Sequence, residues 1–284
     1  MAGFGSALAS TLVVIVHYRS ESATRSLVDD LLQQSCGSSL AIYIVDNSAA
    51  EGVPLALQPE DPRIRIIRPQ CNLGYFAGAA FALEAHLSSA PLPLWVAISN
   101  PDIRLADRAF FCNLYDTYST DAPAVLAPAV LLPNGVDQNP YMVKRPSRRR
   151  MQLYKSMFRY FPVTAAYEIL SRQKQRARAL RRHVSSEFSP NSNKSMSIYA
   201  PHGSFILFHR SYFVAGGNFK HGTFLFGEEI SVAETVRRLD LQVIYDPRFQ
   251  VGHDGHVTVG SWPNRAITRH IKDAAAYVAN EYFQ

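Results

Sequence analysis

Three short apolar runs set the strongest limit on what this chain can fold into. They cover residues 11–17 (TLVVIVH), 40–45 (LAIYIV) and 94–99 (LWVAIS). A strand that is buried on both faces of a sheet has this near-continuous apolar character. Residues 21–34 and 74–87 lie between the runs and carry apolar side chains at helical spacing. Strands that alternate with helices in this way predict an α/β fold with a mostly parallel sheet flanked by helices.

Polar residues follow each of these runs, at the sheet edge where open parallel sheets bind their ligands. Tyr18 and Arg19 follow the first run, Asp46 the second, and Asn100 and Asp102 the third. Asp46 could accept a hydrogen bond from the ring N–H of a nucleotide base, or it could serve only as a turn residue. A carboxylate such as Asp102, in a loop stiffened by proline, suits a hard divalent cation, although such loops are often ordinary turns. We therefore expect one cleft that collects these side chains.

Three later motifs also carry candidate residues. Glu228 and Glu229 follow FLFG and open a predicted helix. The helix dipole favours acids there, but the aromatic wall before them is typical of a general base. His253 in VGHDGH has no third soft ligand nearby, which argues against zinc and favours contact with another metal or a diphosphate. Asn72 and Gly74 precede a helix, either as its N-cap or as a close approach to a phosphate or ribose.

Composition narrows the choice of class. The chain has 284 residues, which is enough for one large domain, and its net charge is +6. No apolar run reaches the roughly 18 residues of a spanning helix, and the first ten residues lack the basic region of a secretory signal. Cys36, Cys71 and Cys112 are odd in number and lack CxxC spacing, so we expect no disulfide or zinc framework and a reducing cytoplasm. GxGxxG, P-loop and GxSxG motifs are missing, which argues against dinucleotide oxidoreductases and α/β hydrolases.

One stretch of the chain is strongly basic. Residues 144–182 hold 13 Lys or Arg and one acid, a net charge of +12, whereas the remaining residues have a net charge of −6. Large apolar side chains recur within it at helical spacing: Met151, Tyr154, Met157, Phe158 and Phe161. A basic amphipathic helix suits an anionic lipid surface. The other interpretation is that its apolar face packs on the protein and its arginines are solvated. We expect residues 141–197 to form a basic helical insertion.

Seven strings, in order along the chain, resemble the family 2 inverting glycosyltransferases, which have the nucleotide-sugar-binding GT-A fold. They are VVIVHYRS, IVDNS, NLGYFAGAAFAL, SNPD, HGSFILFHRSYFVAGGNF, FLFGEE and YDPRFQVGHDGH. The match is to the rhamnosyltransferase-like branch that builds bacterial cell-surface polysaccharide. It covers about residues 11–135 and 198–260. Asn100 stands where the family commonly has an aspartate, and Glu229 where it usually has an aspartate as the base.

The resemblance implies a role for each candidate residue. It assigns contacts with the nucleotide sugar to Tyr18, Arg19, Asp46, Asn72, Gly74 and Asn100. It assigns a divalent cation, Mg²⁺ or Mn²⁺, to Asp102 and His253. Glu229 becomes the general base that takes the proton of the acceptor hydroxyl, with Glu228 as the alternative.

On this resemblance we expect a hexosyltransferase of bacterial surface polysaccharide synthesis, making O-antigen or capsule. It would move a sugar from dTDP-rhamnose or a UDP-sugar to a saccharide acceptor that is linked to a lipid. Residues 1–140 would bind the nucleotide sugar, residues 141–197 would be the insertion, and residues 198–284 would complete the same domain with the acceptor site and a C-terminal helix. The enzyme would be cytoplasmic and peripheral on the inner face of the cytoplasmic membrane, held by anionic lipid.

Two alternatives stay open from the residues alone. A nucleotidyltransferase can have a similar fold, but it usually carries a Gly-rich basic phosphate loop, which VVIVHYRSES lacks. A nucleic-acid-binding protein could use residues 144–182, although the resemblance does not favour nucleic acid as a partner.

Overall fold

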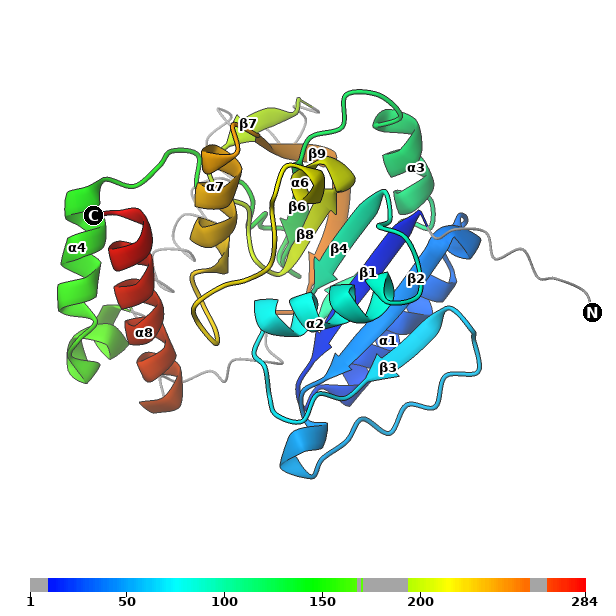
Figure 1. The fold of residues 1–284 in the computed structure, drawn as a ribbon, viewed down its shortest axis with the longest axis horizontal. Helices are drawn as coiled ribbons and strands as arrows, with labels where there is room; N and C mark the ends of the chain where they lie inside the picture. The colour runs from blue at the N-terminus through cyan, green and yellow to red at the C-terminus, as the bar shows by residue number, and fades with distance from the viewer. Residues whose placement is uncertain (1–9, 168–169, 171–193, 256–264) are drawn as a thin grey trace, which may run out of the picture.

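The apolar runs form strands at the centre of one curled sheet, which helices cover on both faces (Figure 1). The computed structural model describes residues 10–167, 170, 194–255 and 265–284. The strands are β1 (Thr11–His17), β2 (Leu40–Asp46), β3 (Ile64–Ile67), β4 (Trp95–Ser99), β5 (Ile103–Arg104), β6 (Val125–Leu131), β7 (Met196–Ile198), β8 (Phe205–His209) and β9 (Val243–His253). The helices are α1 (Glu21–Leu32), α2 (Phe76–Leu87), α3 (Phe110–Thr117), α4 (Arg148–Met157), α6 (Arg210–Val214), α7 (Glu228–Arg238) and α8 (Arg265–Tyr282), with 3-10 turns η1 (Gly37–Ser39) and η2 (Ala49–Glu51).

The sheet has a parallel half and a mixed half. Its strand order is β3-β2-β1-β4-β8-β6-β9-β5, and β7 pairs with β9. β1 runs parallel to β2 and β4, and β2 runs parallel to β3. β8 then runs antiparallel to both β4 and β6, whereas β6 and β9 are parallel to each other. The predicted α/β class is confirmed. In the mixed half, β8 lies between β4 and β6, and β9 lies beside β6.

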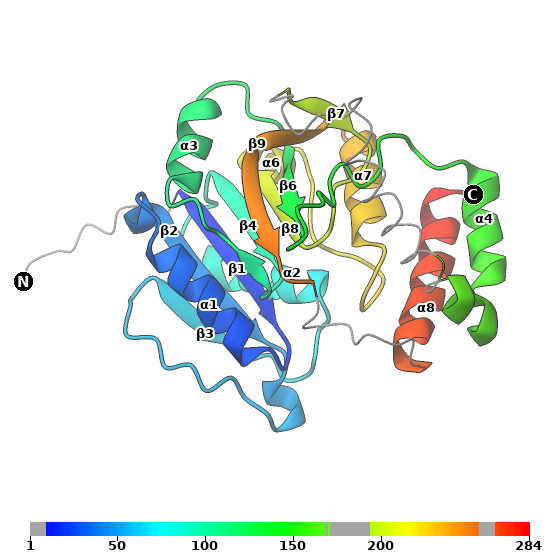
Figure 2. The ribbon, with the colours of Figure 1, turned by 180° about the vertical axis from the view of Figure 1, so that it is seen from behind.

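The continuous apolar character of β1 follows from its burial on both faces. Leu12 and Val14 pack on the side of α2, α6 and α7, together with Phe76. Val13 and Ile15 face the opposite side, where α1 and α3 complete a second core. The two views from front and back show α2 on one face and α1 on the other (Figures 1 and 2). Successive side chains of a strand point to opposite faces, so two cores require an apolar residue at every position.

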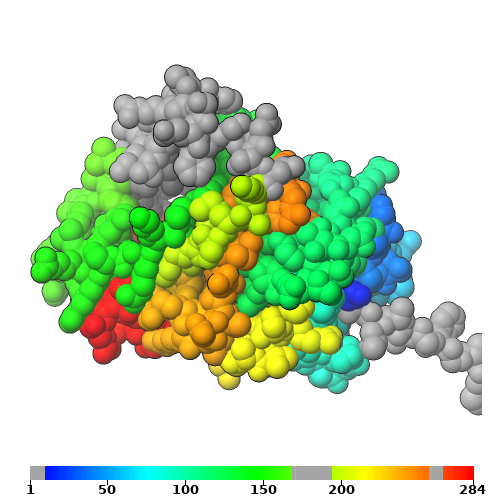
Figure 3. Space-filling model, turned by 90° about the horizontal axis from the view of Figure 1, so that it is seen from above, coloured from blue at the N-terminus to red at the C-terminus, as the bar shows by residue number. Residues whose placement is uncertain are grey.

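Helices α4 and α8 form a third layer at the end of the molecule away from β2 and β3 (Figures 1 and 3). Met151 of α4 packs with Ile230 and Phe283, and it is 5% exposed. Tyr154 stacks on Phe158, which is also buried. Much of the apolar face predicted for a lipid surface therefore packs on the protein. The remaining basic residues, 172–182, lie outside the described residues.

Other apolar side chains around α4 stay exposed. Leu153, Tyr160 and Phe161 are 55%, 62% and 44% exposed. In the part of the chain that the structure describes, no helix combines the length and the apolar character needed to cross a membrane.

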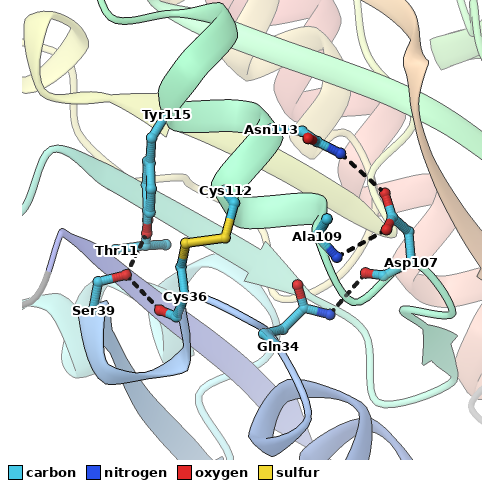
Figure 4. Close-up of a disulfide and its surroundings, with 9 residues drawn as sticks. All are labelled: Thr11, Gln34, Cys36, Ser39, Asp107, Ala109, Cys112, Asn113 and Tyr115. Atoms are coloured by element: carbon cyan, nitrogen blue, oxygen red, sulfur yellow. Dashed lines mark hydrogen bonds between the residues drawn. A yellow bond between two sulfur atoms is a disulfide. The ribbon is translucent and has the colours of Figure 1, made fainter.

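The expectation of no disulfide was wrong, because Cys36 and Cys112 form one (Figure 4). The two residues are 76 positions apart, and the fold brings their Cα atoms to 5.6 Å. The Gln34 side chain donates to the backbone carbonyl of Asp107 beside the bond. Packing of the segment after α1 against α3 makes the pairing, so neither cysteine count nor spacing could indicate it. Cys71 is free and exposed.

Candidate active site

The first group of predicted residues lies where β1 and β2 end. The Arg19 backbone N–H donates to Ser48 Oγ at 2.7 Å, which joins the two loops. The Tyr18 hydroxyl and the Arg19 guanidinium both donate to the carboxylate of Glu51, at 2.9 and 2.7 Å. Asn72 Nδ2 reaches the other Glu51 oxygen at 3.4 Å. Glu51 thus connects three predicted site residues, and the Tyr18 hydrogen bond lowers its pKa. No sequence motif marks Glu51, so its role could not be predicted.

Asp46 is fully buried, and its carboxylate orders the loop that follows β2. Oδ1 accepts from the Ser48 N–H at 3.2 Å, and Oδ2 accepts from the Leu55 N–H at 2.8 Å. Arg68 Nε donates to Oδ2 at 3.3 Å. The turn role of Asp46 is therefore present. A carboxylate offers about four lone-pair positions, so three donors leave room for one more.

Asn47, the residue after Asp46, fastens the Asn72–Gly74 loop to the sheet. Its Oδ1 accepts from the Leu73 N–H at 3.1 Å, and its Nδ2 donates to the Gly74 carbonyl at 3.0 Å. Gly74 has φ 78°, and a Cβ there would lie 2.0 Å from the backbone oxygen of Phe224. Glycine is required for this approach, which joins the loop before α2 to the loop before α7. Helix α2 begins after this loop, so Asn72 is not its N-cap.

Asp102 and His253 lie together because Ile103 of β5 pairs with His253 at the end of β9. Asp102 is 2% exposed and His253 is 8% exposed. His253 Nε2 lies 3.5 Å from Asp102 Oδ1, and His253 Nδ1 is in hydrogen-bond contact with Gln138 Oε1. Two atoms that bind one small cation at roughly 2.1 Å lie about 3.0 to 3.4 Å apart, close to this spacing. A carboxylate oxygen and an imidazole nitrogen therefore fit two positions around a divalent cation.

Asp102 and His253 are two candidate ligands for such a cation. Within residues 10–167, 170, 194–255 and 265–284, no group of three or more His, Cys, Asp or Glu could hold a metal ion. The Asn100 backbone N–H donates to the Ser204 carbonyl at 2.8 Å, which joins the loop after β4 to the segment before β8. His256 lies outside the described residues.

His202 packs beside the Asp102–His253 pair. Its ring centroid lies 5.8 Å from that of His253, and its Nδ1 contacts Ser204 Oγ at 2.8 Å. Burial, with the neighbouring His253, lowers the pKa of His202 to about 3. The ring is therefore neutral at physiological pH. His209 Nδ1 accepts from the Ser211 N–H at the start of α6, and its ring packs against Trp95.

Glu228 and Glu229 are the first two residues of α7. Glu228 is 4% exposed, and burial together with the Glu229 charge raises its pKa to about 8. Burial also raises the pKa of the half-buried Glu229. A Cβ on Gly203 would lie 2.8 Å from Glu229 Oε1, so the carboxyl group lies against the Gly203 backbone. Two acids with raised pKa values at one helix opening are suited to proton transfer.

Tyr75 lies beside the acid pair. Its hydroxyl donates to the Gly203 carbonyl at 2.9 Å. Burial and then the charges of Glu228, Glu229 and Asp102 raise its pKa well above the ordinary value. The Tyr75 hydroxyl and the Glu229 carboxyl group therefore both lie against the Gly203 backbone. Tyr75 was not among the predicted site residues, although it directly follows the Asn-Leu-Gly string.

A cavity of about 360 Å³ links the two groups of predicted residues. Arg19 and Ser20 line it on one side, and Asp102, Arg104 and Asp254 line it on the other. The structure thus collects the predicted residues in two neighbouring groups. Tyr18, Arg19 and Asn72 contact Glu51 in one group. In the other, Asp102 lies beside His253, and Tyr75 and Glu229 both lie against Gly203.

Comparison with known proteins gives two sequence matches. The sequence model described as Glycosyl transferase family 2 matches residues 12–214. The N-acetylglucosaminyl-diphospho-decaprenol L-rhamnosyltransferases of Mycobacterium tuberculosis strains CDC 1551 / Oshkosh and ATCC 25618 / H37Rv are each 21% identical over 252 residues, which cover 86% of this chain and 76% of theirs.

Solved structures are similar in fold. GalNAc-T7, solved with UDP, GalNAc and Mn²⁺, gives a TM-score of 0.55 at 12% identity. The alignment covers 87% of this chain and 44% of that chain, so this chain spans less than half its length. The likeness confirms the predicted GT-A fold class.

Proposed function

The chain belongs to glycosyl transferase family 2, and from this we propose that it is an inverting enzyme that moves a sugar from a nucleoside diphosphate sugar to a saccharide acceptor. Membership favours glycosyl transfer over nucleotidyl transfer. One observation carries the proposal: the His202 ring packs beside His253, and the next residue, Gly203, lies against the Glu229 carboxyl group. A proton acceptor and a candidate cation ligand therefore flank one short segment, as the transfer requires.

The donor in this proposal is dTDP-rhamnose or a UDP-sugar. Similarity to two L-rhamnosyltransferases supports the first. Asp46 would accept the ring N–H of the base with its remaining lone pair, while Arg68 and two backbone N–H groups keep its carboxylate in place. Tyr18 and Arg19 would contact the nucleotide, and Asn72, Gly74 and Asn100 its ribose or diphosphate.

Asp102 and His253 would hold a divalent cation, Mg²⁺ or Mn²⁺. Their 3.5 Å separation supports this assignment. A bound cation neutralises the negative charge that develops on the departing diphosphate. Asp102 and His253 would hold the cation beside the cavity that Asp102 and Arg19 line.

Glu229 is our choice for the general base. It takes the proton of the acceptor hydroxyl while that oxygen bonds to the anomeric carbon, and the bond from this carbon to the diphosphate oxygen breaks with its electrons on the leaving group. Burial raises the pKa of both acids, so their access to an acceptor decides between them, and Glu228 is only 4% exposed. The half-buried Glu229 is more accessible to an acceptor, and Gly203 supports its carboxyl group.

The test of this function begins with thermal shifts for the full chain with dTDP, UDP and GDP, each with and without Mn²⁺. A nucleotide that binds only the folded state adds about 2.7 kcal/mol of stability at 100 times its dissociation constant. We expect stabilisation by dTDP or UDP that increases with Mn²⁺. Release of the nucleoside diphosphate from the matching sugar donor should then depend on an added acceptor. No stabilisation by any of the three nucleotides would contradict the proposal.

A lipid-linked acceptor at the inner face of the cytoplasmic membrane completes the proposal, in the synthesis of O-antigen or capsule. The diphospho-decaprenol in the names of the two relatives supports such an acceptor. We propose that residues 141–197 face anionic lipid. Exposed Leu153, Tyr160 and Phe161 lie among Arg148, Arg149, Arg150 and Arg159, which are also exposed. Each basic residue at an anionic surface contributes about 1 kcal/mol, and salt weakens it.

Co-sedimentation with vesicles of anionic or neutral lipid tests this surface. We expect binding to anionic vesicles only, with a decrease at high salt, and loss when Arg148, Arg149 and Arg159 become Glu. A matched control reverses Arg25, Arg65 and Arg108, which lie on α1, on β3 and before α3 at the other end of the molecule (Figure 1). Equal losses in both triple variants would show a general charge effect and reject a specific surface.

A further inference from the structure

The turn that follows β6 is held rigidly by Asp137. Its Oδ1 accepts from the Val130 N–H at 2.9 Å and from the Asn139 N–H at 2.8 Å. The Tyr245 hydroxyl donates to Oδ2 at 2.7 Å. Because β6 and β9 are neighbours, these bonds fix the turn against the strand that ends at His253.

Gln138, the next residue, projects from this turn to His253. Its backbone N–H donates to the Val130 carbonyl at 2.8 Å, so its main chain is also fixed. Its Oε1 contacts His253 Nδ1, and on the other side of the same ring Nε2 lies 3.5 Å from Asp102 Oδ1. Gln138, His253 and Asp102 form a continuous row of polar groups.

We propose that Gln138 is a positioning residue for the candidate cation site and sets the tautomer of His253. This inference rests on the proposed role of Asp102 and His253. A neutral imidazole has one N–H and one lone pair, and a carbonyl oxygen can accept only from the N–H. With Gln138 Oε1 at Nδ1, the N–H is on Nδ1 and the lone pair is on Nε2, directed at Asp102. A histidine that binds a metal commonly donates its other N–H to such an oxygen.

Asn139, the residue after Gln138, contacts the second histidine of the site, His202. It is 1% exposed, its Nδ2 donates to the Pro128 carbonyl, and its Oδ1 accepts from the His202 N–H at 2.9 Å. Residues 137–139 therefore contact the His253 ring and the His202 main chain, and the centroids of the two rings lie 5.8 Å apart. The segment lies immediately before the basic insertion and outside every string that carried the family resemblance.

The test compares Gln138→Met, which removes the acceptor, with Gln138→Glu, which keeps an oxygen there. Mn²⁺ affinity is measured on the full chain by calorimetry in the presence of UDP or dTDP. Loss of an outer hydrogen-bond partner of a metal ligand typically costs 10- to 100-fold in affinity. We expect that loss in Gln138→Met and an affinity near wild type in Gln138→Glu. Gln250→Met is the matched control, because Gln250 lies on β9 before His253 and its side chain contacts only the Pro247 carbonyl among the bonds described.

A second measurement needs no metal. Nitrogen NMR of the metal-free protein reports which ring nitrogen of His253 carries the proton. We expect the Nδ1–H form in wild type and Gln250→Met, and a mixture of tautomers in Gln138→Met. Wild-type Mn²⁺ affinity together with an unchanged tautomer in Gln138→Met would overturn the inference.

Asp102→Ala and His253→Ala separate this inference from the proposed function. If both weaken Mn²⁺ binding and Gln138→Met does not, the cation site stands and the role of Gln138 is rejected. If neither weakens it, the cation site itself is rejected, and the role of Gln138 with it.

Discussion

The end of β2 and the opening of α7 each bury a carboxyl group, and their surroundings treat it in opposite ways. Asp46 accepts from two backbone N–H groups and from Arg68, so three donors compensate its charge. Glu228 faces another acid, and its Oε1 has no hydrogen-bond partner among the described residues. Burial and the Glu229 charge raise the pKa of Glu228 to about 8.

This difference distinguishes a carboxylate that anchors a loop from a carboxyl group that exchanges a proton. A carboxylate that neighbouring donors satisfy anchors a loop, and removing its charge leaves those donors unpaired. A carboxyl group that burial and a like charge destabilise exchanges its proton near physiological pH. Removing charge should therefore be harmful to stability at Asp46 and beneficial at Glu228, although both residues are buried at the same site edge.

The largest expected effect is on the acid pair itself. Glu229→Gln should lower the transfer rate by about 10²- to 10⁴-fold, because the acceptor hydroxyl loses its base. Nucleotide binding, measured by calorimetry, should stay near wild type. Glu228→Gln is the comparison variant. An inactive Glu228→Gln beside an active Glu229→Gln would assign the base to Glu228 instead.

Gly203→Ala should displace the Glu229 side chain without changing that residue itself. The added Cβ would lie 2.8 Å from Glu229 Oε1, so the carboxyl group must move. A displacement of about 1 Å at a reacting group can cost roughly 10²-fold in rate. We expect such a loss in kcat, with a melting temperature close to wild type, because the displaced atom is the end of a flexible side chain.

Gly37→Ala is a matched control for that substitution. Its Cβ would lie 2.5 Å from Arg63 Nη1, again the end of a charged side chain, but far from the acid pair. A similar loss of kcat in both alanine variants would mean that Gly203 acts through the fold and not through Glu229.

Asp46→Asn should destabilise the loop after β2. The amide retains one acceptor oxygen and loses the other, so a buried N–H or Arg68 loses its partner. An unsatisfied buried group costs about 1 to 3 kcal/mol. Chemical denaturation should show this loss in the free protein, before any nucleotide is added. Unchanged stability would mean that Asp46 does not order the loop.

Glu228→Gln gives the smallest effect, and its sign is opposite. The folded pKa of Glu228 is about 8 and lies above the ordinary value of 4.5, so folding favours the protonated form. That stabilisation is complete below about pH 4.5 and is lost as the pH rises through about 8. Wild type should therefore melt at a lower temperature near pH 9 than near pH 5, and Glu228→Gln should reduce this difference by at least about 2 °C.

Glu84→Gln, on the exposed side of α2, controls for general charge effects and should follow the wild-type pH profile. If Glu228→Gln follows the wild-type profile as well, the pKa of Glu228 is not raised in the folded protein as we expect.

Much of the parallel half could be predicted from the sequence. The runs at residues 11–17, 40–45 and 94–99 became β1, β2 and β4 with small changes at their ends. Their polar followers lie at one edge, because parallel strands end on the same side. The mixed half was less predictable, since β5 and β7 have two and three residues and exist through pairing with β9.

Residues that position others were the least predictable part of the site. Glu51, Asn47 and Tyr75 act through contacts with segments that lie far away in the sequence. Gln138 likewise gains its role only because β6 lies beside β9. No local pattern distinguishes such residues from ordinary polar or aromatic residues in loops.

By itself the sequence determined the α/β class, the strands of the parallel half and the acids at the openings of loops and helices, because strand burial and helix periodicity are written locally in the order of side chains. Only the tertiary structure decided which acids are compensated and which are not, where the face of α4 packs, and that Cys36 meets Cys112. These outcomes depend on distances between segments that are remote along the chain. Asp46 and Glu228 are equally acidic in the sequence, and their neighbours across the fold make one an anchor and the other a proton-exchanging group.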